Sequence, residues 1–304
     1  MNLLYLAPYL LLVAAEVAIR AVKWQVLLSP TKRCSFWTLN SATLIGLMAN
    51  NVLPFRVGEF VRAYAGARLA GIPYSTSLAT VVVDRVLDGL TVSAIFIFAL
   101  LFQPLPEQVK ALGYLAAAMY TVMLVVLVGL LTQEQRTLRL ITWALGPVPA
   151  TLRARLLEAL ITFVHGLSVF RNFRLFALAI ITSFAIWIGY AAGVYLMILA
   201  FDINLSFFDA FIVLIIVTLG VTLPSTPGFV GVMEGGIVFG LNGLFGIDKT
   251  QAFAMAVVYH VSQYIPITVG GIIALWLERM SMTEIAHVPT SGQDIDGPAA
   301  ASST

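Results

Sequence analysis

The chain has 304 residues, of which 60% are hydrophobic and only 11% are charged. Soluble domains carry about 25% charged residues, so this composition excludes a soluble globular fold. The formal net charge of +2 gives no bias towards nucleic acid, and the single cysteine excludes an intrachain disulfide. The composition predicts an all-α polytopic membrane protein.

Uncharged or nearly uncharged runs follow one another along the chain at helical length. A spanning helix needs about 20 mostly apolar residues. In chain order, the predicted full spans are the five ranges 3–22, 75–102, 111–132, 175–201 and 250–277. They are longer than the ten-residue alternating segments of an outer-membrane barrel, which favours a helical bundle.

Two further apolar segments are interrupted by proline in a similar way. The segment 34–74 contains Leu53–Pro54, and the segment 207–247 contains Leu223–Pro224. Proline lacks the amide donor and clashes with the preceding turn, so helices break there. Broken backbone persists at membrane depth only where protein or water satisfies it. We therefore predict that each segment forms a re-entrant helical hairpin with its Leu-Pro pair near the tip.

Basic residues orient these segments, because cytoplasmic loops are enriched in Lys and Arg. The stretch 20–33 has four basic residues and no acid, and the stretch 133–174 has six arginines and two glutamates. Both are predicted to be cytoplasmic, whereas 202–209, with two acids and no base, is predicted to lie outside. The first hairpin then enters from the cytoplasm and the second from the outer side.

The two halves also share the spacing of short motifs. Gly71 follows the first Leu-Pro pair and precedes Asp84 by thirteen residues, and Gly246 stands in the same relation to Tyr259. Asp88 then matches Gln263, and the second copy has five extra residues before its glycine. Units that enter from opposite sides are inverted repeats, a common plan in transporters.

The predicted domain organisation is a single transmembrane domain followed by a tail. The domain is expected over 1–280, with one repeat at about 3–102, the arginine-rich cytoplasmic stretch at 133–174 and the second repeat at about 175–277. The tail, 281–304, is small and polar and is expected to be disordered and cytoplasmic.

Charged residues inside a bilayer cost about 2.5–3.5 kcal/mol each, so they are functional candidates. The first cluster is Arg56, Glu59 and Arg62 on the first hairpin, at a spacing of three along one side of a helix. The helix end after the break attracts anions, and arginine pairs bind phosphate through several donors. The competing interpretation is that Glu59 only neutralises the arginines at a cytoplasmic interface.

The second cluster, early in a predicted span, is Asp84, Arg85 and Asp88. The carboxylates share a helix face, and they either orient an arginine that binds phosphate or form a structural ion pair that locks the span to the hairpin. The other candidate binding residues are polar groups on or beside the second hairpin and final span, with one asparagine of the first hairpin. They are Asn51, Thr222, Ser225, Thr226, Glu234, Tyr259, His260 and Gln263.

Glu234 and His260 suggest proton chemistry as well as binding. A carboxyl in an apolar stretch should be paired or protonated, and a histidine there either carries a proton coupled to transport or is a satisfied hydrogen-bonding group. The sequence contains no nucleophile elbow, zinc-protease motif, Walker loop or cysteine–histidine metal spacing. We therefore predict no cofactor, no metal and no enzyme activity.

Three stretches together resemble one family. They are NVLPFRVGEFVR at 51–62, ATVVVDRVLD at 79–88, and LPSTPGFVG at 223–231 with Glu234–Gly235. In these motifs the chain is similar to the transmembrane region of lysylphosphatidylglycerol synthases, also called flippase-like, over about residues 1–280.

The resemblance implies a multi-pass protein of a cell inner membrane or archaeal membrane that moves a lipid between leaflets. Members fused to an aminoacyl-transferase domain expose aminoacylated phosphatidylglycerol, and this chain is expected to be a free-standing member without that domain. Free-standing members are connected with glycolipid, polyprenyl-phosphate or hopanoid pathways. The expected partners are a lipid with a phosphate headgroup and the bilayer, together with either a second copy of the chain or a lipid synthase. The alternatives are a membrane-embedded enzyme acting on a lipid headgroup and a non-catalytic synthase subunit.

Overall fold

A computed structural model describes residues 1–54, 57–101, 107–133, 172–222 and 226–286, with a few positions between 136 and 153. Every regular element in these ranges is helical, which confirms the predicted class. Within them, four helices are long and apolar enough to cross a membrane: Leu3–Leu28, Val109–Val126, Phe173–Ala200 and Lys249–Leu277. The chain is an integral membrane protein.

The first half consists of a short 3-10 turn η1 (Leu3–Tyr5) and five helices. They are α1 (Leu6–Leu28), α2 (Phe36–Val52), α3 (Gly58–Ala70), α4 (Tyr74–Leu100) and α5 (Glu107–Thr132). α4 has the length of a span, but the charged residues Asp84, Arg85 and Asp88 lie within it. α3 ends where Gly71 takes the left-handed conformation (φ 58°) that glycine adopts without penalty.

The second half begins at α8 (Phe173–Ala200), where the Asn172 side chain accepts hydrogen bonds from two backbone amides of the first turn. The following elements are α9 (Phe207–Thr222), the 3-10 turn η4 (Pro227–Phe229), α10 (Val232–Val238), the π-helix η5 (Phe239–Leu244), α11 (Lys249–Leu277) and α12 (Met282–Ala286). Asp248 caps α11 in the same way by accepting from the Gln251 amide.

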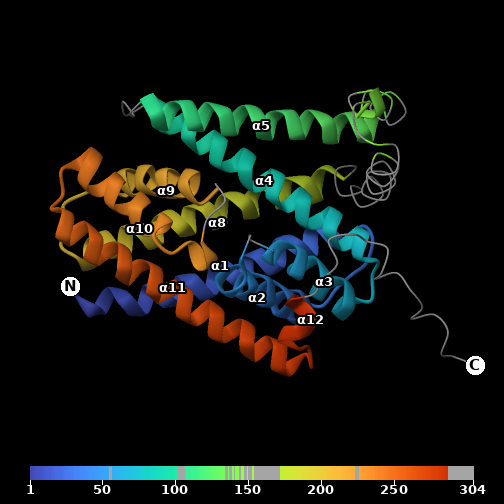
Figure 1. Cartoon of the computed structure of the whole chain (residues 1–304), viewed down its shortest axis with the longest axis horizontal. Helices are drawn as coiled ribbons and strands as arrows, with labels where there is room; N and C mark the ends of the chain where they lie inside the picture. Colours follow the sequence, from blue (N-terminus) through green and yellow to red (C-terminus); the bar gives the residue numbers. More distant parts are fainter. Residues whose placement is uncertain are drawn as a thin grey trace, which may run out of the picture.

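Three hydrophobic cores hold the described helices together. One is built mainly from α1 to α4, another mainly from α8 to α11 with the start of α1, and a smaller third from α4, α5 and α9. α1 packs along α8, and α2 packs along α11. α5 lies along one edge of the molecule (Figure 1) and leaves many large apolar side chains exposed, as a lipid-facing helix does.

The two arms of the first proline-interrupted segment touch through glycine. A Cβ atom at Gly46 of α2 would lie 2.5 Å from the Arg62 Cβ, and one at Gly58 of α3 would lie 2.2 Å from the Gly46 carbonyl oxygen. The Gly58 amide donates to the Asn50 side chain at 2.9 Å. Glycine at these positions therefore brings Arg62 against α2.

The end of α2 and the 3-10 turn η4, which belong to the two proline-interrupted segments, meet at the middle of α11. The Asn51 amide donates to the Thr268 hydroxyl at 2.9 Å, and the Tyr264 hydroxyl donates to the Asn51 carbonyl at 3.3 Å. Gly228 of η4 lies at the same place, because a Cβ there would be 2.6 Å from the Tyr264 ring and 3.1 Å from the Asn51 carbonyl oxygen.

The structure differs from the sequence prediction at both ends of the chain. α1 continues to Leu28, so Arg20 and Lys23, which were assigned to a cytoplasmic stretch, are buried in the helix bundle. At the other end, α12 forms inside the predicted disordered tail, and its Glu284 pairs with Arg68 and accepts from the Tyr64 hydroxyl at 2.7 Å. The remainder of that tail and most of the arginine-rich stretch lie outside the described residues.

Candidate functional site

A buried network of charges joins α1, α3 and α4. Lys23, which is 0% exposed, places its ammonium 2.7 Å from Asp84 Oδ1 and 2.6 Å from Asp88 Oδ1. Arg62 of α3 approaches the other Asp84 oxygen at 2.7 Å. Asp84 and Asp88 thus face α1 and α3 together, as their shared helix face predicted.

Two further arginines complete the network. Arg20 Nη1 lies 3.2 Å from Asp88 Oδ2, and the same guanidinium donates twice to the Tyr190 hydroxyl of α8, at 3.2 and 3.0 Å. Arg85 Nη2 reaches both aspartates, at 3.0 and 3.2 Å, and its Nη1 lies 3.6 Å from Glu59 Oε1. The Arg62–Asp84 and Arg85–Glu59 pairs join α4 to α3 of the first proline-interrupted segment, as the structural interpretation of this cluster predicted, and Arg20 joins α4 to α1.

The charges of this network do not cancel. Its cations are Arg20, Lys23, Arg62 and Arg85, and its carboxylates are Glu59, Asp84 and Asp88. Four positive and three negative charges leave a sum of +1 in a region where charge is poorly solvated. An anion would therefore be favoured beside the network.

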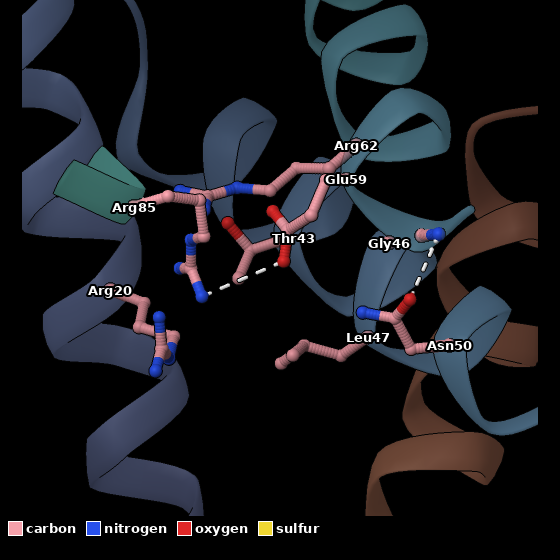
Figure 2. A pocket seen from close by; sticks show the side chains of 9 residues that line it. Arg20, Thr43, Gly46, Leu47, Asn50, Glu59, Arg62 and Arg85 are labelled. Carbon is pink, nitrogen blue, oxygen red and sulfur yellow. Dashed lines mark hydrogen bonds and ion pairs between the residues drawn. The ribbon is translucent and has the colours of Figure 1, made fainter. Parts of the chain in front are cut away.

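A pocket lies beside the network, between α1, α2, α3 and α4 (Figure 2). Its empty space is about 200 Å³ when the part open to the surroundings is counted, but the space that the centre of a water molecule can occupy is only about 10 Å³. The lining residues are Arg20, Thr43, Gly46, Leu47, Asn50, Gly58, Glu59, Arg62 and Arg85. The three arginines come to the pocket from three different helices, and Arg85 extends towards Glu59 across it (Figure 2).

Some of these arginine donors have no hydrogen-bond partner among the described residues. They are Nε and Nη2 of Arg62 and Nε of Arg85, and all three atoms are buried. The Arg62 side chain is only 3% exposed, and its guanidinium stacks 4.3 Å from the centroid of the Trp24 ring. Buried polar atoms are nearly always satisfied in proteins, and Glu59 Oε2 at the same pocket is also unpaired. These atoms therefore indicate a place for water or for another polar group that accepts from the arginines.

A contact separate from the ion network joins the second proline-interrupted segment to α11. His260 Nδ1 lies 2.6 Å from Glu234 Oε1, and the other Glu234 oxygen accepts from the Gly231 amide at 2.7 Å. Glu234 is therefore paired, one of the two states expected for a carboxyl in an apolar stretch. Neither residue lines the pocket beside the arginines, which lies within the first half instead of between the two proline-interrupted segments.

The remaining candidate residues are placed as follows. Gln263 contacts the Met233 sulfur at 3.1 Å, whereas Tyr259 turns towards Tyr9, with ring centroids 5.6 Å apart. Thr226 is exposed and donates to the Val230 carbonyl, and Asn51 binds α11 instead of lining the pocket. Arg56, Ser225 and the side chain of Thr222 lie outside the described residues.

Sequence reasoning missed the contribution of α1. Arg20 and Lys23 were counted as cytoplasmic charges because they follow an apolar run. Their spacing of three, with Glu16 four residues before Arg20, is the signal that could have identified one helix face carrying charge. Tyr190, in an otherwise apolar span, carried no comparable signal.

The amino-acid sequence of the chain matches a known protein family. The family model for the lysylphosphatidylglycerol synthase TM region matches residues 1–271. A UPF0104 membrane protein of Methanothermobacter thermautotrophicus is 25% identical over 279 residues, covering 88% of this chain and 81% of that protein. A UPF0104 membrane protein of Methanocaldococcus jannaschii is 25% identical, over 78% of this chain and 97% of that protein.

A third relative has a different name. The glycosyltransferase AglD of Haloferax volcanii is 24% identical over 90% of this chain, but the match covers only 50% of AglD. No solved structure matches the chain. Because the family model covers nearly the whole described transmembrane region, the chain belongs to the family of the lysylphosphatidylglycerol synthase transmembrane region.

Proposed function

We propose that the protein moves a lipid with a phosphate-containing headgroup between the leaflets of a cell inner membrane or its archaeal counterpart. The observation that carries this proposal is the pocket beside the ion network, where buried donors of Arg62 and Arg85 lack partners. Arginine's planar fork matches phosphate oxygens, and the network's residual charge of +1 favours an anion.

The pocket as it stands is small. The space that the centre of a water molecule can occupy is about 10 Å³, roughly the room of one water. A phosphate would therefore enter only when the side chains around the pocket move apart, while the acyl or polyprenyl chains would stay in the bilayer. The class therefore includes phospholipids, phosphate-bearing glycolipids and polyprenyl phosphates.

The proposal includes the two re-entrant hairpins. α2 has 17 residues and α3 has 13, so at 1.5 Å per residue they rise about 25 and 20 Å, less than the about 30 Å of a bilayer core. The end of α2 lies at the middle of α11, beside η4 of the second segment. This placement supports hairpins that meet near the midplane, where transporter sites commonly lie.

Two contacts between a glutamate and a basic residue, at equivalent positions of the two halves, support the inverted repeat. Glu59 stands twelve residues before Gly71, and Glu234 stands twelve before Gly246; Arg85 and His260 each follow their glycine by fourteen. In both halves the glutamate meets the basic residue, at 3.6 Å for Arg85 and 2.6 Å for His260. Each hairpin would therefore be tied to its following span by a corresponding pair.

The test is leaflet exchange in reconstituted liposomes that contain fluorescent phosphatidylglycerol. Dithionite quenches the outer leaflet only, so further quenching reports exchange. Arg62→Lys keeps one charge but removes Nε and the planar fork, and we expect it to slow exchange at least tenfold, since one lost charge-assisted hydrogen bond is worth about 1.5–3 kcal/mol.

Arg68→Lys is the matched control, because Arg68 lies on the same helix but faces Glu284 outside the pocket. It should exchange lipid at the wild-type rate. If the wild-type protein does not raise exchange above protein-free liposomes, or if folded Arg62→Lys matches it, the proposed function is wrong.

A lipid-modifying enzyme is the second candidate, and the name of the Haloferax relative is its only specific support. Half of that relative lies outside the match, so the activity in its name need not reside in the shared part. Incubating purified protein with a lipid extract and following headgroups by mass spectrometry separates the candidates: a changed headgroup mass favours an enzyme, and redistribution of an unchanged lipid favours transport.

A further inference from the structure

Glu16 is a buried acid in the first span that the proposed lipid site does not use. It lies on α1 and is 7% exposed. Its carboxyl faces α8 at Gly189, where a Cβ atom would lie 3.2 Å from Glu16 Oε1. The glycine therefore makes room for this carboxyl at the interface of two spanning helices.

Glu16 differs from the other buried acids of the described chain. Asp84 and Asp88 each lie within 3.2 Å of at least two cations, and Glu234 pairs with His260. Glu16 has neither an ion pair nor a hydrogen bond among the described residues. An isolated carboxylate in an apolar region is so costly that such a group neutralises instead.

The titratable groups around Glu16 do not supply a fixed counter-charge. α1 contributes Tyr9 and Arg20, α8 contributes Tyr190, and α11 contributes Tyr259. Only Arg20 is cationic, and its guanidinium is already engaged with Asp88 of α4 and with the Tyr190 hydroxyl. Glu16 is thus surrounded by phenols and one arginine that has other partners.

We propose that Glu16 is a proton-binding site whose occupancy decides where Arg20 points. The two residues are four apart on one helix, the spacing at which a carboxylate and an arginine pair. With the proton bound, Glu16 is neutral and Arg20 stays on Asp88 and in the pocket wall. When the proton leaves, the new carboxylate draws Arg20 towards itself and away from the pocket.

The direction of coupling follows from this competition and rests on the proposed function. Withdrawal of Arg20 removes one positive charge from the pocket, so a phosphate binds more weakly when Glu16 has lost its proton. By linkage, a bound phosphate strengthens proton binding by the same factor. The proton and the anionic headgroup would therefore bind together, which lets a proton gradient drive lipid movement.

The first experiment tests the proton without any ligand. Infrared spectroscopy separates the C=O stretch of a protonated carboxyl from that of a carboxylate. We expect wild-type protein at neutral pH to show a protonated-carboxyl band that disappears on alkalinisation and is missing from Glu16→Gln. Glu107→Gln, which changes an exposed acid on α5, should retain the band. Equal bands in wild type and Glu16→Gln would overturn the proposal whatever the protein transports.

The second experiment tests the coupling with dimethyl phosphate, a small anion whose charge is constant across the pH range used. Binding to purified protein is followed by phosphorus NMR line broadening at mildly acidic and mildly alkaline pH. Wild-type affinity should fall at least fivefold at alkaline pH, the lower end of typical coupling strengths. Glu16→Gln mimics the protonated acid and should bind equally at both pH values, whereas Glu234→Gln should retain the pH dependence.

The outcomes distinguish the two proposals. If dimethyl phosphate binds wild type equally at both pH values, or if Glu16→Gln keeps the pH dependence, the coupling is wrong and the lipid site stands. If dimethyl phosphate binds at neither pH and lipid exchange is also absent, the proposed function fails and the coupling fails with it.

Discussion

Asp84→Asn is the most direct perturbation of the buried ion network. Asp84 is 1% exposed and meets three cations: Lys23 at 2.7 Å, Arg62 at 2.7 Å and Arg85 at 3.0 Å. Asparagine has nearly the same volume, so the substitution removes the charge without leaving a cavity. The sum of charges in the network would rise from +1 to +2.

The expected loss of stability comes from leaving buried cations with fewer ion-pair partners. Removing one member of a buried pair costs about 3–5 kcal/mol. At about 2 °C for each kcal/mol in a chain of this size, the thermal midpoint should fall by about 6–10 °C. The assay is thermal unfolding of the detergent-purified protein, followed by intrinsic tryptophan fluorescence.

Two further variants show whether burial and charge cause the fall in the thermal midpoint of Asp84→Asn. Glu107→Gln breaks an ion pair of similar length, 2.8 Å from Glu107 to Lys110. The Glu107 side chain is 86% exposed, so the thermal midpoint should hardly change. Adding Arg62→Gln to Asp84→Asn returns the sum of charges in the network to +1, and the double variant should recover part of the lost thermal midpoint. If Asp84→Asn unfolds at the wild-type temperature, Asp84 does not hold these helices together and our account of the network is wrong.

Two other predictions concern the second half. Gly228→Ala forces a side chain into a left-handed position (φ 64°) against Tyr264, and we expect the free energy of unfolding to fall by about 1–3 kcal/mol. Gly235→Ala is the control: a Cβ at this position has nothing within 4 Å, so the variant should unfold at no lower temperature than wild type. His260→Leu leaves Glu234 with only its backbone partner and should lower the thermal midpoint, whereas His260→Gln keeps a donor and should recover part of the loss. Equal midpoints for the two variants at 260 would show that this hydrogen bond does not contribute to stability.

In the proposed function, the side chains of the ion network would contribute both to stability and to binding. Asp84 and Asp88 pair with most of the cationic groups around them, and these pairs hold α4 against α1 and α3. What remains is a small excess of positive charge and a few arginine donors at the pocket.

The sequence by itself determined the membrane class, the breaks in the two proline-containing segments and the family. These features depend on composition and on local backbone chemistry, which neighbouring residues specify. Thus Asp84 and Asp88 were correctly expected to share one face of their helix, where Lys23 contacts both, and Glu234 was correctly expected to be paired or protonated.

Only the tertiary structure decided which charges share a site. Lys23 and Asp88 are 65 residues apart in the chain, and Arg20 and Tyr190 are 170 apart. A basic residue at the end of an apolar run has the same local pattern whether its helix stops at the membrane surface or continues into a bundle. The difference lies in which faces of α1, α4 and α8 pack together, because burial between helices, and not sequence spacing, brings an arginine to an aspartate.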